Sequence, residues 1–97
     1  MQFFFNTGQV KAASKAAGSH WFEPSTMRFF KSRVLSVVYG GRFFVTSEQG
    51  PNGVRAYSVR EASEDGSSIS TVGEFQGWAT APQAKREAKR LSSLVTA

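Results

Sequence analysis

Two runs of β-branched and aromatic residues flank a Gly-Gly pair near the middle of the chain. The first run covers residues 34–39 and the second covers residues 42–48. Gly40 and Gly41 suit a two-residue hairpin loop, because both central positions of a type I′ turn require positive φ. The chain is therefore expected to be built on an antiparallel hairpin.

Two further strands are predicted after this hairpin. A Gly-Pro-Asn-Gly turn precedes residues 54–62, which alternate so that Tyr57 and Val59 share one face. An Asp-Gly turn then leads into residues 69–78, which have the pattern of a strand weakened by Gly73 and Gly77. The pattern thus predicts a sheet of three or four strands.

Residues 80–96 have the pattern of an amphipathic helix. Thr80 can cap this helix, and Pro82 is tolerated in its first turn, where the missing N–H is not needed. At 100° per residue, a narrow apolar arc contains Ala84, Ala88, Leu91 and Val95. A cationic strip lies nearly opposite and contains Lys85, Arg86, Lys89 and Arg90. The apolar arc is expected to pack on one face of the sheet.

The N-terminal residues differ in composition from the rest. Residues 7–20 are mostly Ala, Lys, Gly, Ser and Gln, with Val10 as their one sizeable apolar side chain. Their composition permits a helix at residues 9–17, but so short a helix needs a packed face to be stable. We therefore expect residues 1–20 to be a mobile basic arm and residues 21–97 to form a single α+β domain.

The length of 97 residues supports one such domain with one thin core. A short helix is expected after Pro24, before the first strand. The predicted fold class is α+β, with an antiparallel sheet, the closing helix on one face and this short N-terminal helix. Since the chain has neither a long apolar run nor a secretory signal pattern, we expect it to be cytoplasmic and not membrane-bound.

Residues able to support catalysis are scarce. The chain has no Cys, one His and one Asp, and His20 and Asp65 fall in segments that would not hold a catalytic triad rigidly. These residues also lack the spacing of a metal site, and the Gly-rich turns match no phosphate-binding loop. The expected protein is not an enzyme and needs neither a cofactor nor a metal.

Charge is distributed unevenly along the chain, which has a net charge of +5 and a pI of about 10.1. Residues 1–42 have six basic residues and one acidic, residues 43–77 have two and five, and residues 78–97 have four and one. A basic balance favours polyanionic partners. The helix at 80–96 concentrates four cations in six residues, so Lys85, Arg86, Lys89 and Arg90 are the candidate nucleic-acid-binding residues. The alternative is an ordinary solvated helix surface.

A second possible function is direct binding to a host protein, as an inhibitor. Its candidate contact residues are Phe44, Tyr57, Trp78 and Arg55, because the chain has more aromatic side chains than one small core can bury. The acidic middle of the chain would contribute Glu61, Glu64, Asp65 and Glu74. Salt dependence separates the two functions, because phosphate binding weakens steeply as salt rises.

Several segments resemble a family of small phage-encoded domains of unknown function. These segments are Trp-Phe-Glu-Pro-Ser-Thr-Met-Arg-Phe-Phe-Lys-Ser-Arg at 21–33, and residues 43–48, 55–60 and 71–76. The resemblance covers residues 21–92. It implies a phage accessory protein acting in the host cytoplasm by binding host machinery, with defence complexes among the possible targets.

The end of the chain also resembles the double-stranded RNA-binding domain. The features in common are Gly50-Pro51 between two strands and Lys-Arg-Glu-Ala-Lys at 85–89, where the closing helix begins. The resemblance implies that Lys85, Arg86 and Lys89 contact phosphates. Together, these patterns favour binding to nucleic acid or to a host nucleoprotein complex.

Overall fold

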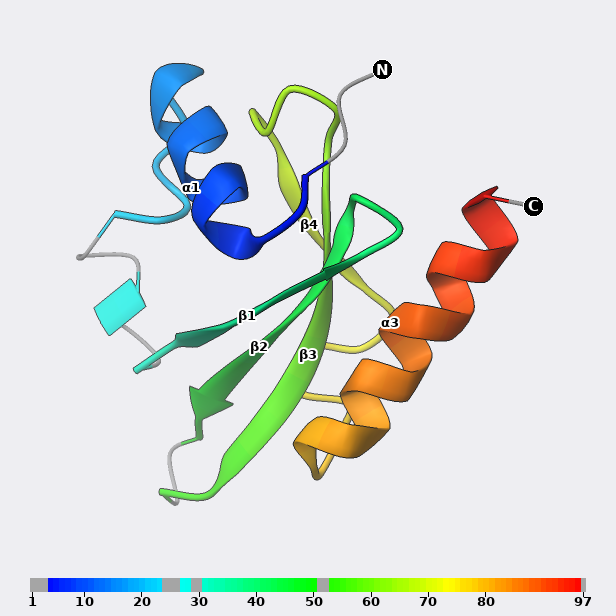
Figure 1. Ribbon diagram of the computed structural model, residues 1–97. Helices are drawn as coiled ribbons and strands as arrows, with labels where there is room; N and C mark the ends of the chain where they lie inside the picture. The colour runs from blue at the N-terminus through cyan, green and yellow to red at the C-terminus, as the bar shows by residue number, and fades with distance from the viewer. Residues whose placement is uncertain (1–3, 24–26, 29–30, 51–52, 97) are drawn as a thin grey trace.

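The computed structural model describes residues 4–23, 27–28, 31–50 and 53–96, and of residues 95–96 the backbone alone. Its elements are α1 (Thr7–Ala16), β1 (Arg33–Tyr39), β2 (Phe43–Gln49), β3 (Arg55–Ala62), β4 (Ile69–Val72) and α3 (Ala81–Thr96). The strands form one antiparallel sheet in the order β1-β2-β3-β4, with α1 and α3 on opposite faces (Figure 1). The predicted α+β class is confirmed.

The predicted hairpin is present, and Gly40 and Gly41 have the expected positive φ values of +60° and +77°. Its loop is one residue longer than predicted, because Tyr39 pairs with Phe43 and Arg42 therefore lies in the loop as well. The fourth strand is shorter than predicted, because Gly73 adopts a φ of +76° directly after β4 and the chain leaves the extended conformation. The chain returns to the sheet at Trp78, which forms an antiparallel bridge with Tyr57.

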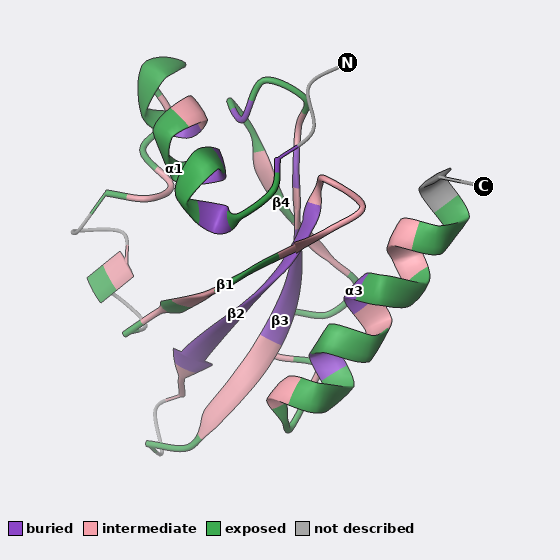
Figure 2. Ribbon diagram, viewed as in Figure 1, coloured by how far each residue is buried: buried purple, intermediate pink, exposed green. Residues whose placement is uncertain are grey.

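Alternation along the strands gives the sheet two different cores. On the α3 side, the buried residues are Phe43, Val45, Val59, Ala84 and Ala88. On the α1 side, the buried apolar residues are Phe4, Val10, Phe44 and Ala62. Figure 2 shows the consequence: β2 is buried along almost its whole length, whereas α3 is exposed along its outer surface.

The structure corrects the expectation of a separate N-terminal arm. Val10 and Ser14 of α1 are fully buried, and the Ser14 hydroxyl donates a hydrogen bond to the Gly66 carbonyl. Asn6 caps the helix by accepting a hydrogen bond from the Gln9 N–H at 3.0 Å. The second face of the sheet supplies the packing that the short helix lacks by itself. The folded domain therefore includes the residues described before 21.

The short helix predicted after Pro24 falls largely on residues 24–26 and 29–30, which lie outside the described residues. Met27 and Arg28, between these gaps, are helical. The complete N-terminal helix in the described part of the chain is α1, which begins fourteen residues before Trp21.

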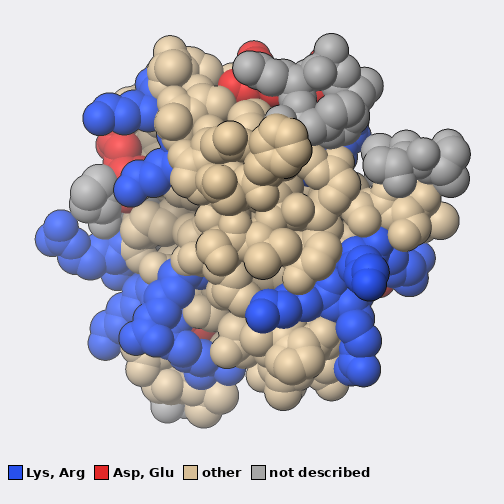
Figure 3. All heavy atoms as spheres, in the orientation of Figure 1, with Lys and Arg blue, Asp and Glu red and all other residues tan. Residues whose placement is uncertain are grey.

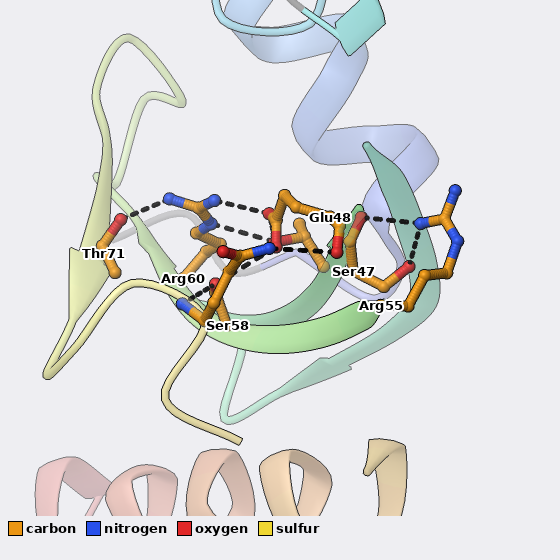
Figure 4. Close-up of polar contacts among 8 residues, drawn as sticks. Ser47, Glu48, Arg55, Ser58, Arg60 and Thr71 are labelled. Carbon is orange, nitrogen blue, oxygen red and sulfur yellow. Dashed lines mark hydrogen bonds and ion pairs between the residues drawn. The ribbon is translucent and has the colours of Figure 1, made fainter. Parts of the chain in front are cut away.

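A buried ion pair lies on the α1 side of the sheet, beyond the apolar core (Figure 4). The Arg60 Nη2 atom lies 2.6 Å from Glu48 Oε1, and the two side chains are 9% and 1% exposed. Glu48 also accepts hydrogen bonds from the hydroxyls of Thr46 at 2.6 Å and Ser58 at 3.2 Å. Arg60 donates to Thr46 Oγ1 at 3.0 Å and to the Thr71 hydroxyl. The pair thus connects β2, β3 and β4.

The same group of side chains holds the segment that leads to α3. The Gln76 N–H donates to the Ser58 hydroxyl at 2.8 Å, and the Gln76 side chain donates to the Glu48 carbonyl at 3.0 Å. Arg60 also lies over two aromatic rings, 5.4 Å from the ring centroid of Trp21 and 5.3 Å from that of Phe75. These contacts anchor residues 75–78 to the sheet just before the helix begins.

Replacing Glu48 tests how strongly the fold depends on the buried pair. Glu48→Gln removes the negative charge and leaves Arg60 buried without compensation, so the free energy of unfolding should fall by about 3–5 kcal/mol. The matched control is Glu61→Gln, because Glu61 pairs with Arg42 at 3.5 Å with side chains 35% and 24% exposed. That change should cost less than about 1 kcal/mol. Urea denaturation measures both, and equal losses would contradict this role for the buried pair.

The hairpin glycine supports the position of α3. A Cβ atom on Gly40 would lie 2.6 Å from the Cβ of Ser92, whereas one on Gly73 would have nothing within 4 Å. Alanine at either site incurs roughly 1–2 kcal/mol for positive φ, and Gly40→Ala should lose about 1–3 kcal/mol more from the steric clash. Thermal and urea unfolding of both variants measure the difference. Indistinguishable stabilities would show that the hairpin does not pack against α3 as described.

Candidate nucleic-acid interface

The orientation of α3 is set by two small residues. Ala84 and Ala88 face the sheet and are fully buried from solvent. They pack against Phe43, Val45 and Val59 in the core on this side. Alanine lets the helix axis approach the sheet closely. Leu91, the next residue of the predicted arc, is half-buried against the same core. The side chain of Val95, the fourth, lies outside the described residues.

The start of α3 is capped as predicted. The Gln83 N–H donates to the Thr80 hydroxyl at 3.4 Å, and the Thr80 N–H donates to the Gln83 side chain at 3.3 Å. This reciprocal arrangement has the form of a capping box. It begins the helix at Ala81 and fixes which residues face outward.

The four candidate cations all lie on the exposed side of α3. Lys85, Arg86 and Lys89 form no ion pair within the part of the chain that the structure describes. Arg90 is different, because its Nε and Nη2 atoms donate to Glu87 at 2.5 and 2.9 Å. We call Lys85, Arg86 and Lys89 the α3 strip.

Glu87 is the one acidic residue in the sequence of α3. A hydrogen bond donated by Arg90 lowers the pKa of Glu87, and the charge of Arg90 lowers it further. The same hydrogen bond raises the pKa of Arg90. Glu87 is therefore ionised at neutral pH and offsets the charge of Arg90, which leaves the strip as the uncompensated part of the helix surface.

The residues predicted to bind a protein partner lie in different environments. Phe44 is fully buried among Trp21, Phe22 and the α1 side of the core, so its prediction as a contact residue is wrong. Tyr57 and Trp78 are half-buried against the α3 side of the core. Their backbones exchange two hydrogen bonds, of 2.7 and 3.1 Å, which fixes the segment before α3.

Trp78 also lines a shallow hollow at the start of α3. The hollow has a volume of about 590 Å³, and Gln83, Arg86 and Arg90 form part of its wall. An indole beside guanidinium groups is a surface on which an unpaired base can stack. Trp78 is thus placed close to the α3 strip and not at a separate surface.

The acidic candidates lie in different local settings. Glu61 pairs with Arg42 on the sheet, whereas Glu64, Asp65 and Glu74 are exposed on turns. Hydrogen bonds donated by the side chain and backbone of Ser67, and by the hydroxyl of Ser63, lower the pKa of Asp65 to about 2. Asp65 therefore remains a carboxylate near neutral pH and serves to order the turn between β3 and β4.

Figure 3 shows where the charged side chains lie on one face of the molecule. Lys and Arg side chains gather over α3, beside the start of β1 and over α1, and the visible Asp and Glu side chains lie mainly at the top of the view and beside α1. Arg28, Lys31 and Arg33 line one shallow hollow together with Arg55, although the sequence pattern did not mark these three residues as a site. The excess of basic residues in 1–42 was the only sequence feature that pointed to them. That excess could not predict the strand pairing that brings Arg55 close to them.

Among the residues that the structure describes, no cluster of His, Cys, Asp and Glu could hold a metal ion. The Nδ1 atom of His20 lies 2.8 Å from Glu23 Oε1, and both side chains are exposed. Within the same residues, no helix has both the length and the apolar character needed to cross a membrane.

Comparison with known families identifies a match over most of the chain. Residues 6–89 match the model of a family of unknown function, DUF7447. The match begins at Asn6, the cap of α1, which agrees with the packing of that helix on the sheet. No curated protein and no solved structure matches the chain. The expectation of an uncharacterised family is confirmed: the chain belongs to the DUF7447 family.

Proposed function

We propose that this protein is a non-enzymatic binding protein that engages nucleic acid, free or within a host nucleoprotein complex, through the outer surface of α3. The observation that carries this proposal is the α3 strip, whose three cations are exposed and form no ion pair among the described residues. The buried alanines on the other side of the helix hold these cations outward.

The geometry of the strip suits a backbone of repeated phosphates. Lys85 and Lys89 are one helical turn apart, about 6 Å along the axis, so both can reach one nucleic-acid backbone. Arg86 extends the strip to one side and can donate two hydrogen bonds to a single phosphate. Lys85 and Arg86 also lie in the first turns of α3, where the helix dipole favours anions.

The biological setting of this binding role is part of the proposal. The resemblance of residues 21–92 to small phage-encoded domains supports an accessory protein of phage origin that acts on host nucleic acid or nucleoprotein. The competing possibility is an inhibitor that contacts a host defence protein directly. The half-buried state of Tyr57 and Trp78 and the burial of Phe44 leave that possibility with less aromatic surface.

Removing two charges from the strip tests the proposal. Lys85→Gln/Lys89→Gln should weaken binding to a labelled duplex of about 20 base pairs by tenfold or more near 0.1 M salt, because two counterion-releasing contacts are lost. The plot of log affinity against log salt should become shallower by about 1.8. Fluorescence anisotropy between about 50 and 200 mM salt, with DNA and RNA duplexes and single strands, measures both quantities.

The chain offers a matched control for this variant. Lys11 and Lys15 form the same spacing on the exposed side of α1, on the other side of the sheet. Lys11→Gln/Lys15→Gln should therefore change affinity and salt slope far less. Equal effects of the two double variants would show that binding depends on net charge and not on the α3 strip. If the protein bound a host protein and no nucleic acid, and salt did not weaken that binding, the inhibitor function would be supported instead.

A gain of affinity is expected when Glu87 loses its charge. Glu87→Gln removes the carboxylate beside the strip and releases Arg90, so the same duplex should bind severalfold more tightly at low salt. Glu64→Gln is the control, because Glu64 is exposed on the turn after β3 and changes net charge equally. Anisotropy titrations of both variants compare them. A gain of the same size in each would contradict a local role for the helix surface.

A further inference from the structure

A second group of cations lies at the end of the sheet from which α3 begins. Arg28, Lys31, Arg33 and Arg55 line one shallow hollow of about 670 Å³, together with Gln49. None of the described residues that line this hollow is an Asp or a Glu. Arg28, Lys31 and Arg33 are exposed and form no ion pair with any residue in the described ranges.

The turn that presents these cations is held in an uncommon conformation. Lys31 has a φ of +49°, a region that residues other than Gly rarely adopt. Arg55 stabilises the turn, because its Nη2 atom donates to the Lys31 carbonyl at 2.9 Å and its Nη1 atom donates to Ser47 Oγ at 3.0 Å. Backbone strain of this kind persists where surrounding contacts determine it, and it is concentrated at functional sites.

This second group and the α3 strip lie on the same side of the sheet. Tyr57, Val59 and Leu35 belong to the core on the α3 side. Residues two apart in a strand share a face, so Arg55 lies on the same face as Tyr57, and Arg33 on the same face as Leu35. The helix begins at the same end, since Trp78 pairs with Tyr57 shortly before Ala81, whereas its later turns approach the Gly40 hairpin.

We propose that Lys31 and Arg33, supported by Arg55, form a second phosphate-binding site for the same nucleic acid that contacts the α3 strip. This inference rests on the proposed function and deepens it, because it defines a footprint with two points of contact. The longest dimension of the molecule is 40 Å, the length of about 12 base pairs of duplex at a rise of 3.4 Å each. One backbone of modest length can therefore contact both groups.

The test compares four versions of the full chain. These are the wild type, Lys31→Gln/Arg33→Gln, Lys85→Gln/Lys89→Gln, and the variant with all four changes. The turn variant should weaken binding of the labelled duplex by about tenfold or more and make the salt slope shallower by about 1.8. The combined variant should make the slope shallower by about 3.6, because the two sites contact one polyanion.

The outcomes separate this inference from the proposed function. If the turn variant behaves like Lys11→Gln/Lys15→Gln while the helix variant weakens binding, the second site is overturned and the function of α3 stands. If neither variant weakens binding, both proposals fail. If the turn variant alone weakens binding, the α3 strip is not the site and the two-point footprint is overturned.

A glycine variant distinguishes binding from folding at this turn. Lys31→Gly suits the positive φ, so its melting temperature should equal or exceed that of the wild type. It also removes one cation, so its salt slope should be shallower by about 0.9. Unchanged binding by this variant would show that Lys31 serves only the conformation of the turn.

Discussion

The ion pair between Glu48 and Arg60 is the interaction on which the arrangement of the surface depends. It lies on the face of the sheet opposite α3 and is linked to the segment before the helix through Ser58, whose hydroxyl donates to the Glu48 carboxylate and accepts from the Gln76 N–H. The Gln76 side chain also donates to the backbone carbonyl of Glu48. Burial of a charge is costly unless its partners satisfy it, and here Thr46, Ser58 and Thr71 supply the remaining hydrogen bonds. The segment before α3 is therefore fixed in place.

From that anchored start, α3 crosses the sheet and packs against β3, β2 and β1. Thr80 begins it, Ala84 and Ala88 bring it close to the sheet, and Gly40 makes room for Ser92 near its end. Because the two alanines are buried against the sheet, the opposite side of the helix faces solvent. The cations of the α3 strip are consequently displayed by the same packing that stabilises the domain, and they need no contact of their own to be held outward.

Local patterns predicted the parts of the fold that local chemistry determines. The Gly40-Gly41 turn, the alternation of Tyr57 and Val59, and the register of Ala84 and Ala88 with the cations all follow from period and turn type. The arm was predicted wrongly because the residues that bury Val10 lie far along the chain, at Phe44 and Ala62. Burial by distant residues leaves no signal in a window of neighbouring ones.

The same limit explains what was missed at the candidate site. Lys31 and Arg33 were not predicted, and Arg55 was predicted only as a contact for a protein partner. These three residues are separated in sequence and meet because β1 and β3 both pair with β2. The buried Glu48 and Arg60 are likewise ordinary charged residues in an alternating strand until the pairing places them together. Phe44 was assigned to the surface because aromatic residues exceeded the capacity of one core, whereas the sheet has two.

An NMR titration that follows the backbone amides while a duplex is added tests directly whether nucleic acid binds the two groups of cations. Such binding should change the amide shifts mainly at residues 81–90, 27–28 and 31–33, and should leave the turn at Ser63–Ser67 unaffected. Changes centred on the acidic turn, or on α1, would contradict it. So would a spectrum that does not respond to the duplex at low salt.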